Sequence, residues 1–474
     1  MAATTGVLLL YVGTTLPMFM DVGYPDSATL LKVRELVHTG VLYGPFDKPP
    51  YLVTIYGPLT YILLAIFYSV AEACGWDPQI AVRIGVLLSF VGCLTAVFAI
   101  ARRAFGSATI GSLSVLFATS VVPFALWATQ IRGDFAGTFF SLSGTAFFLE
   151  SLDRRNHRIA YGGAILCFAA ALLTKQTFVA APTAITVWLA FRKQWSAALL
   201  FAGGVVLLAV LGYFVVWLRE PAMLEHYAAV QNPVLDFRGA RAITIEAMRQ
   251  LLVPFSVAGL VASLSETNPR TRPLIAVGAA SWMIAGLTAA QVGANINYFA
   301  EPLLLSSVAA GKGLHAVHTR FSRRRWLLTA FAMVLAVGWF IPTLRNEQRV
   351  FRKALEQRQI ARYRRGPWDR FASAVSGQRV LSTIPAISVL GVSPEMPDPF
   401  LNSVLEMRGK WSSRPIVESL NRGRYDVVVI WRDQLFARGG YRGVPLWNAR
   451  IRSSVASRYR RACFFYDWEI WVPR

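Results

Sequence analysis

The sequence predicts a mainly α-helical membrane protein, a polytopic bundle of about 11 transmembrane helices followed by a small C-terminal α/β domain. Three observations support this class. The 474 residues are 55% hydrophobic and 16% charged, whereas a soluble protein has about 25% charged residues. Hydrophobic runs recur across residues 1–342. Residues 343–474 instead mix turn-forming residues with short β-type runs, so we predict a transmembrane domain over 1–342 and a soluble domain over 343–474.

The predicted spans follow the hydrophobic runs in order. The first run has no basic segment before it and no small-residue cleavage site after it, so we expect a retained helix and not a signal peptide. The spans are expected at about 5–20, 79–101, 107–124, 135–151, 159–174, 177–191, 197–217, 250–264, 273–291, 298–312 and 326–342.

The segment 51–73 is also apolar enough to cross a membrane, but Pro58 interrupts it. Charge decides its placement. If the segment 51–73 does not cross the membrane, every second loop between the spans is net basic, as cytoplasmic loops should be. If it crossed, Arg102-Arg103 would face the side opposite to the later basic loops. We therefore predict a re-entrant or surface-lying helix inside a first outer loop at about 21–78.

This topology places the N-terminus in the cytoplasm and the C-terminal domain outside. A run of arginines and lysines at 345–365 opposes it, because bases are expected inside after the last span. Long domains, however, are translocated largely regardless of charge. If the domain is outside, the basic run is predicted to lie on anionic membrane lipids or to contact an acidic acceptor.

Composition excludes several classes of function. The net charge of +22 does not indicate nucleic-acid binding, because the sequence has no recognisable nucleic-acid-binding module and much of the excess lies in short loops between spans. The four cysteines have no CxxC spacing, which argues against a disulfide framework or a zinc site. The histidines show no metal-ligand spacing either, so no metal-ligating residue is predicted.

Asp26 is the main candidate for chemistry. It follows the first span, behind Pro25, and begins a helical-looking run. In that position it is either a helix N-cap or a general base. The predicted topology places further charged residues on the same side of the membrane, which favours the catalytic alternative. There, cations could bind a phosphate while the carboxylate accepts a proton. These further residues are Lys48, Arg132, Asp134, Lys175 and Glu301.

The cations in this set have structural alternatives. Lys48, in Asp47-Lys48-Pro49-Pro50, is either a phosphate ligand or a lysine that snorkels to the interface, with Asp47 as its local partner or a cap. Arg132 forms either a salt bridge with Asp134 or part of a phosphate and acceptor site. Lys175 lies in a very short turn between two spans, where it is either a phosphate ligand or an interface lysine.

The remaining candidates are assigned to an acceptor cavity. Asn297 and Glu301 lie about one helical turn apart on one face, beside Tyr298, and helix capping is the alternative. Tyr56, in the run Tyr56-Gly57-Pro58-Leu59, is placed in the same cavity. Arg83, near the start of the second span, is expected to snorkel to the interface.

The order of these motifs resembles the GT-C class of integral-membrane glycosyltransferases. The similarity rests on the Asp in the first outer loop, then Arg34-Glu35 with Thr39-Gly40, the acid-Lys-Pro-Pro and Tyr-x-Pro-Leu runs, and a second span ending Ala-Arg-Arg-Ala-Phe-Gly (101–106). The branch it is most similar to contains aminoarabinose transferases of lipid A, protein O-mannosyltransferases and galacturonosyltransferases of lipopolysaccharide core. Later stretches around 131–134, 172–177 and 297–299 are similar to the last of these.

The resemblance implies a bacterial inner-membrane enzyme of the cell envelope that takes a sugar from a polyprenyl-phosphate-linked donor. The acceptor would be a lipid, glycan or protein reached from the periplasmic side. Asp26 would be the base of an inverting displacement, Lys48 a ligand of the donor phosphate, and Asp134 a second acid. The aminoarabinose branch has Asp-Glu-x-Arg where this chain has Asp26-Ser27-Ala28-Thr29, so its donor contacts are not transferred. No cofactor is certain; a divalent metal is possible.

Two other functions remain open. A transporter or lipid flippase would show internal repeats and interrupted helices near the middle of the membrane, whereas here the charged residues gather at one face. A non-catalytic member of the same class would keep the fold but transfer no sugar, so a change at Asp26 would remove no transferase activity.

Overall fold

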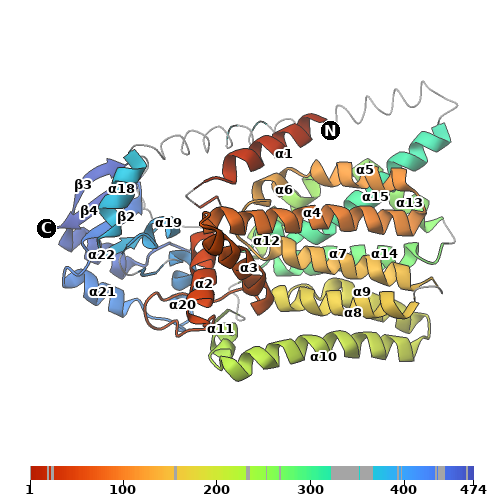
Figure 1. The fold of residues 1–474 in the computed structure, drawn as a ribbon. Coiled ribbons are helices and arrows are strands. Elements are labelled where there is room, and N and C mark those ends of the chain that lie inside the picture. Colours follow the sequence, from red (N-terminus) through yellow and green to blue (C-terminus); the bar gives the residue numbers. More distant parts are fainter. Residues whose placement is uncertain are drawn as a thin grey trace.

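The fold is a helical bundle with a small mixed domain at one end (Figure 1). It is known from a computed structural model, which describes residues 2–18, 21–22, 26–153, 157–230, 235–251, 253–265, 268–321, 348, 352, 367–391, 394–396, 398–432, 435, 444–465 and 468–474. The predicted span 326–342, the domain boundary at 342/343 and most of the basic run at 345–365 lie outside these residues.

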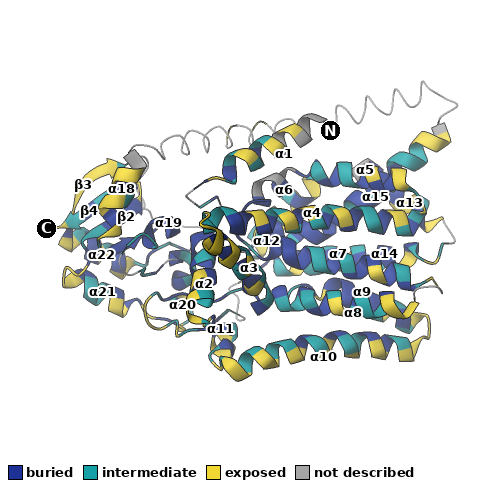
Figure 2. Cartoon of the chain, in the orientation of Figure 1, coloured by how far each residue is buried: buried dark blue, intermediate teal, exposed yellow. Residues whose placement is uncertain are grey.

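The long apolar helices of the bundle run side by side (Figure 1). Within the described residues, three helices, α4, α8 and α10, are long and apolar enough to cross a membrane. The bundle consists of α1 (Ala2–Thr15), α4 (Pro78–Phe105), α5 (Ala108–Thr119), α6 (Val122–Trp127), α7 (Asp134–Ser151), α8 (His157–Thr174), α9 (Ala180–Phe191), α10 (Trp195–Arg219), α13 (Val253–Leu264), α14 (Thr271–Thr288) and α15 (Ala300–Phe321). Buried residues fill the space between these helices, and α10 exposes most of its surface (Figure 2).

The loops predicted to be basic and the loops predicted to hold the candidate site residues lie at opposite ends of this bundle. At one end Arg103 pairs with Glu150, the Arg270 guanidinium donates to the Arg103 carbonyl (3.2 Å), and the Asn268 side-chain amide donates to the Ala104 carbonyl (2.7 Å). At the other end are the first residue of α7, the turn after α8 and the first turn of α15. The bundle therefore separates a basic end from an end that holds the candidate site.

The first loop forms two helices, α2 (Asp26–Thr39) and α3 (Pro58–Cys74). Pro58 occupies the first turn of α3, where a missing N–H costs nothing, and Gly75 ends the helix in the left-handed conformation. Both helices lie at the site end and are inclined to α4 (Figure 1). The exposed stripe Ile62, Ile66 and Val70 leaves one apolar face of α3 uncovered, which is compatible with the predicted surface-lying helix.

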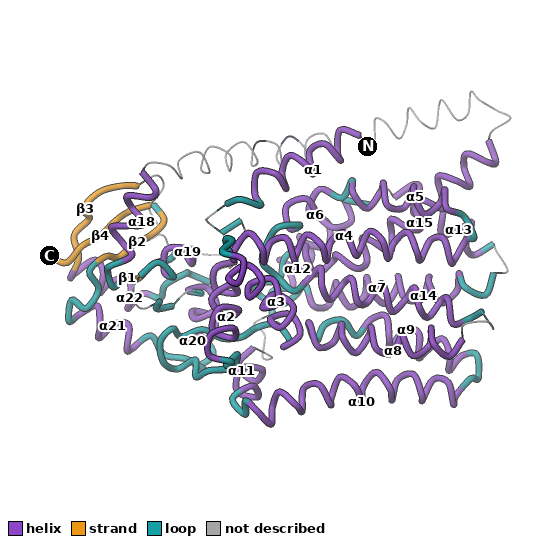
Figure 3. Tube along the Cα trace, in the orientation of Figure 1, coloured by secondary structure: helices purple, strands orange, loops and turns teal. Residues whose placement is uncertain are grey.

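The C-terminal segment is a mixed α/β unit, and its strands form a single sheet (Figure 3). The sheet order is β1-β2-β4-β3, with β1 parallel to β2 and the other pairs antiparallel. The short β-type runs predicted in this segment include Val427–Trp431, which forms β2 with its three central residues buried, and a run starting at Arg379, where β1 spans Val380–Ser382. The other elements are β3 (Tyr459–Phe465), β4 (Trp468–Pro473), α18 (Pro367–Ser376), α19 (Pro385–Ser388), α20 (Pro399–Met407), α21 (Arg414–Asn421) and α22 (Ala449–Arg458).

This unit packs directly on the first loop. The Asn402 amide donates to the Tyr51 carbonyl (2.9 Å), and the Met396 N–H donates to the Pro50 carbonyl (3.0 Å). The Tyr51 ring meets Trp411 edge-on. The short helices α11 (Met223–Val230), α12 (Phe237–Arg249) and the 3₁₀ turn η1 (Ile296–Phe299) complete the same end. The candidate residues thus lie between the bundle and the C-terminal unit.

Candidate active site

Asp26 begins α2 and is completely buried. One carboxylate oxygen accepts from the Val22 N–H and the other from the Ile131 N–H, both at 3.1 Å. The same carboxylate lies 3.7 Å from the Arg83 guanidinium. These N–H groups belong to other segments and not to α2. Asp21 accepts from the Ser27 N–H in the first turn of α2, at 2.7 Å, as an N-cap side chain would.

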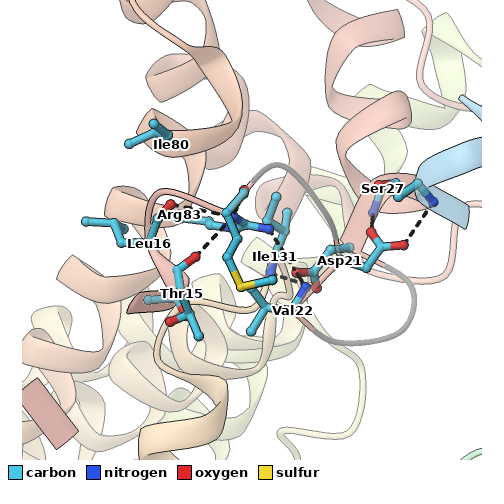
Figure 4. A network of polar contacts seen from close by, with 12 residues as sticks. Thr15, Leu16, Asp21, Val22, Ser27, Ile80, Arg83 and Ile131 are labelled. Atoms are coloured by element: carbon cyan, nitrogen blue, oxygen red, sulfur yellow. Dashed lines mark hydrogen bonds and ion pairs between the residues drawn. The ribbon is translucent and has the colours of Figure 1, made fainter. Parts of the chain in front are cut away.

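Arg83 is a neighbour of Asp26 that the sequence interpretation did not assign to the candidate site. The prediction that it snorkels is wrong, because its side chain is 0% exposed. It donates to the carbonyls of Thr15 (3.2 Å), Leu16 (3.5 Å) and Met18, and so fixes the chain after α1 (Figure 4). An arginine six residues into an apolar helix is itself a signal for a buried partner. That signal identifies Arg83 but does not say which carboxylate it meets.

Burial raises the pKa of Asp26 to about 7, with Arg83 opposing the rise and the nearby Asp21 carboxylate adding to it. Desolvation disfavours the ionised carboxylate because its charge loses water. A carboxylate that titrates near neutral pH can both accept and release a proton under ordinary conditions.

A second carboxylate–cation pair lies on the cavity side of the site. The Lys175 ammonium donates to Asp134 at 2.8 Å and stands 4.0 Å above the centre of the Tyr298 ring. Asp134 is the first residue of α7, and Lys175 directly follows α8. A small cavity of about 20 Å³ opens beside this pair. Its polar lining includes Asp134, Thr138, Lys175, Ser281, Thr288, Asn297, Tyr298 and Glu301.

Glu301 lies in the same cavity wall but is held by hydroxyl groups. Its carboxylate accepts from the Ser141 hydroxyl at 2.5 Å, and Ser281 lies nearby. Asn297 lies beside Asp134 on η1. The predicted cavity residues Asn297, Tyr298 and Glu301 are therefore brought together with Asp134.

Arg132 connects the two carboxylates. It lies in the turn before α7, directly after Ile131, whose N–H binds Asp26. The Arg132 guanidinium interacts electrostatically with Tyr56, Asp134 and Asp26. Together with Asp134 and Asn297 it also lines a second small cavity next to the first. One turn thus places a cation between both candidate acids, and Tyr56 joins the same cluster.

Glycine explains why the Tyr56-Gly57-Pro58 run reaches this cluster. The Gly57 N–H donates to the Thr174 carbonyl at 2.8 Å. A Cβ atom at Gly57 would collide with the Leu173 carbonyl oxygen. Only a residue without a side chain lets the first loop approach the turn that holds Lys175 this closely.

Lys48 is placed differently from the other predicted cations. Its side chain is exposed on the loop between α2 and α3. Among the described residues, no hydrogen bond or ion pair joins its ammonium group to the Asp26 or Asp134 cluster. The flanking loop is anchored elsewhere: Glu220 accepts from the Leu42 and Tyr43 N–H groups, and His226 accepts from the Thr54 N–H at 2.9 Å.

The described part of the chain contains no group of three or more His, Cys, Asp or Glu side chains arranged to hold a metal ion. The two acids of the cluster are instead matched by Arg83, Arg132 and Lys175.

Comparisons with known proteins agree on the architecture. Residues 47–217 match the model of a family described as dolichyl-phosphate-mannose-protein mannosyltransferase. ArnT from Cupriavidus metallidurans, solved with undecaprenyl phosphate, is 13% identical; the match covers 98% of this chain and 96% of ArnT, with a TM-score of 0.64. The archaeal oligosaccharyltransferase AglB from Archaeoglobus fulgidus, in complex with an inhibitory peptide and a dolichol-phosphate, is 11% identical over 97% of this chain and 72% of AglB, with a TM-score of 0.57.

The chain has the GT-C fold. A comparison with curated proteins returned no match. The resemblance seen in the sequence motifs is thus confirmed at the level of the fold. ArnT aligns over nearly the whole of both chains, so the GT-C arrangement includes the C-terminal α/β unit as well as the bundle.

Proposed function

We propose that this GT-C chain is a membrane glycosyltransferase that moves a sugar from a polyprenyl-phosphate-linked donor to a lipid, glycan or protein acceptor. The observation that supports this most directly is the gathering of Asp26, Arg132, Asp134 and Lys175 at one end of the bundle. The named contents of the ArnT and AglB structures, undecaprenyl phosphate and dolichol-phosphate, point to the same class of donor.

The cations would act on the leaving group. As the bond from the anomeric carbon to the phosphate oxygen breaks, negative charge develops on the polyprenyl phosphate. Arg132, which interacts electrostatically with Asp134 and Asp26, and Lys175, paired with Asp134, would stabilise that charge. Lys48 is proposed as a further phosphate ligand, reaching from the exposed loop.

Asp26 is the proposed base. It would take the proton of the acceptor hydroxyl while the oxygen attacks the anomeric carbon and the phosphate leaves from the opposite side. A single direct displacement of this kind inverts the anomeric centre. Both Asp26 oxygens accept from backbone N–H groups, so one of these contacts has to open before the carboxylate can take the acceptor proton. Asp134, which lines the cavity, would orient the acceptor.

The membrane orientation completes the proposal. The end with Arg103, Arg270 and their carbonyl partners would face the cytoplasm of a bacterial inner membrane, as the positive-inside rule predicts. The site, the C-terminal unit and the acceptor would then lie on the outer face. A transporter is less well supported, because the charged cluster lies at one end of the bundle and not midway along it.

The test is mass spectrometry of lipid-linked sugars and cell-envelope glycans in cells with and without the protein. We expect the deletion to accumulate a polyprenyl-phosphate sugar and to shorten one glycan by one sugar. Plasmid-borne wild-type protein should reverse both changes, and the Asp26→Asn variant at equal abundance should reverse neither. Unchanged pools in the deletion, under conditions where the protein is present, would overturn the proposal in favour of transport or a non-catalytic role.

A further inference from the structure

Asp21 joins two parts of the chain that are far apart in sequence. Its Oδ1 accepts from the Ser27 N–H in the first turn of α2 at 2.7 Å. Its Oδ2 accepts from the Ala386 N–H in α19 of the C-terminal unit at 2.9 Å. One carboxylate therefore links the start of the helix that begins with Asp26 to the C-terminal unit (Figure 4).

Apolar contacts close the same junction on both sides. Met18 and Val22 pack in one buried cluster with Ile384 and Ile387. On the other side Ala28, Leu31 and Leu52 pack against Val389. With both sides covered by side chains, the two N–H groups have little access to water, so the Asp21 oxygens satisfy donors that would otherwise cost free energy.

We propose that Asp21 is a positioning residue through which the C-terminal unit holds α2, and with it the Asp26 carboxylate, in place. The inference rests on the proposed role of Asp26. It assigns the C-terminal unit a part in catalysis other than acceptor binding: the unit supplies an N–H donor that fixes the head of α2.

The carboxylate of Asp21 also acts on Asp26 through its charge. Among the described residues, the titratable and charged groups that face Asp26 are Tyr11 on α1, Asp21 in the loop, Arg83 on α4 and Arg132 before α7. Arg83 and Arg132 favour its ionised form, whereas Asp21 disfavours it and so raises the pKa of Asp26. Loss of the Asp21 charge should therefore lower that pKa, a result that a purely mechanical link would not produce.

The variant Asp21→Asn tests both the hydrogen-bonded link to the C-terminal unit and the effect of the Asp21 charge on Asp26. An amide has one acceptor oxygen and one donor nitrogen, so it can satisfy only one of the two N–H groups. We expect hydrogen exchange to quicken both in 26–34 and in 384–390, because the two segments lose their common anchor. The matched control is Asn402→Ala, which removes a different contact between the C-terminal unit and the first loop, at Tyr51; we expect it to leave exchange in both segments unchanged.

The second measurement is the pH profile of turnover, with lipid extract from deletion cells as donor. In Asp21→Asn we expect the acidic limb to move to lower pH, and in Asn402→Ala to stay at the wild-type position. Wild-type exchange in both segments, or an unmoved limb in an active Asp21→Asn enzyme, would overturn the inference. If Asp26→Asn retains activity, the proposed base has failed instead, and the exchange result still decides whether Asp21 positions α2.

A second variant covers the case in which Asp21→Asn does not fold. Ala386→Pro removes the N–H donor of the C-terminal unit and leaves the Asp21 charge in place. Faster exchange in 26–34 would support the link. Wild-type exchange in that segment would contradict it.

Discussion

The site contains two carboxylate–cation pairs that differ in what surrounds them. Asp26 and Arg83 are 3.7 Å apart and both side chains are 0% exposed. Asp134 and Lys175 are 2.8 Å apart, with 9% and 11% of their side chains exposed. The first pair is enclosed by backbone groups from α1, the first loop and the turn before α7. The second lines a cavity.

The two ionic pairs have similar chemistry but different surroundings, and we expect them to have different roles. Arg83 uses its donors on backbone carbonyls, so the Asp26 pair holds several segments together as well as placing a carboxylate. Lys175 instead borders the Tyr298 ring and a small cavity of about 20 Å³, room for about one water molecule. We therefore expect changes at the first pair to affect both folding and chemistry, and changes at the second to affect mainly ligand binding.

The largest effect is expected from Asp26→Asn. Loss of the proposed base should lower the rate of sugar transfer by about 10²–10⁴-fold, the usual contribution of general-base catalysis. The measurement is turnover in purified membranes, with thermal unfolding to show that the variant is folded. Asp134→Asn is the matched comparison, and we expect it to weaken acceptor use with a smaller loss of rate. If Asp26→Asn changes the rate of sugar transfer by less than about threefold while Asp134→Asn abolishes transfer, the base is Asp134 and not Asp26.

Arg83→Ala tests the structural role of the enclosed pair. Removing one partner leaves a buried carboxylate and several carbonyls unpaired, which should destabilise the protein by about 3–5 kcal/mol. The measurement is the thermal unfolding midpoint in detergent. The double variant Arg83→Ala with Asp26→Asn should recover part of that loss, because no uncompensated charge remains. Equal instability of the single and double variants would show that the carbonyl contacts, and not the ion pair, dominate.

Lys175→Met tests the cavity pair. It removes a cation but keeps an apolar side chain of similar length, and the lost charge-assisted contact should weaken donor binding by about 1.5–3 kcal/mol, or about 10- to 150-fold in KM. Lys193→Met, on an exposed lysine at the opposite end of the bundle, is the control. Lys48→Met extends the comparison to the loop: an unchanged donor KM in that variant would remove Lys48 from the proposed phosphate ligands.

The smallest effect is expected from pH. The proposed base works only when ionised, and the pKa of Asp26 is raised to about 7. Activity should therefore increase as pH rises through about 7 and level off above it, with a loss of about tenfold between pH 8 and pH 6. The measurement is kcat/KM across this range in the wild-type protein, because this ratio follows the pKa of the free enzyme. A flat profile between pH 6 and pH 8 would argue against Asp26 as the proton acceptor.

The sequence predicted the Asp134 cluster better than the Asp26 cluster, for a physical reason. Asp134, Lys175 and Asn297 lie at the ends of apolar helices, and helix ends on one side of a membrane must come close together in a bundle. The partners of Asp26 are backbone N–H groups and an arginine inside a helix. Residue type says nothing about which backbone groups meet, so the N-cap and base interpretations could not be separated from the pattern.

Sequence alone determined the class of fold, the end of the bundle at which the charged residues gather, and the β-type runs that form β1 and β2, because hydrophobic periodicity and charge placement are local properties. Only the tertiary structure decided that Arg83 is buried against Asp26, that Asp21 caps α2 while bound to Ala386, and that Lys48 stays exposed. Each of these depends on the approach of segments distant in the chain, which is fixed by packing across the whole molecule.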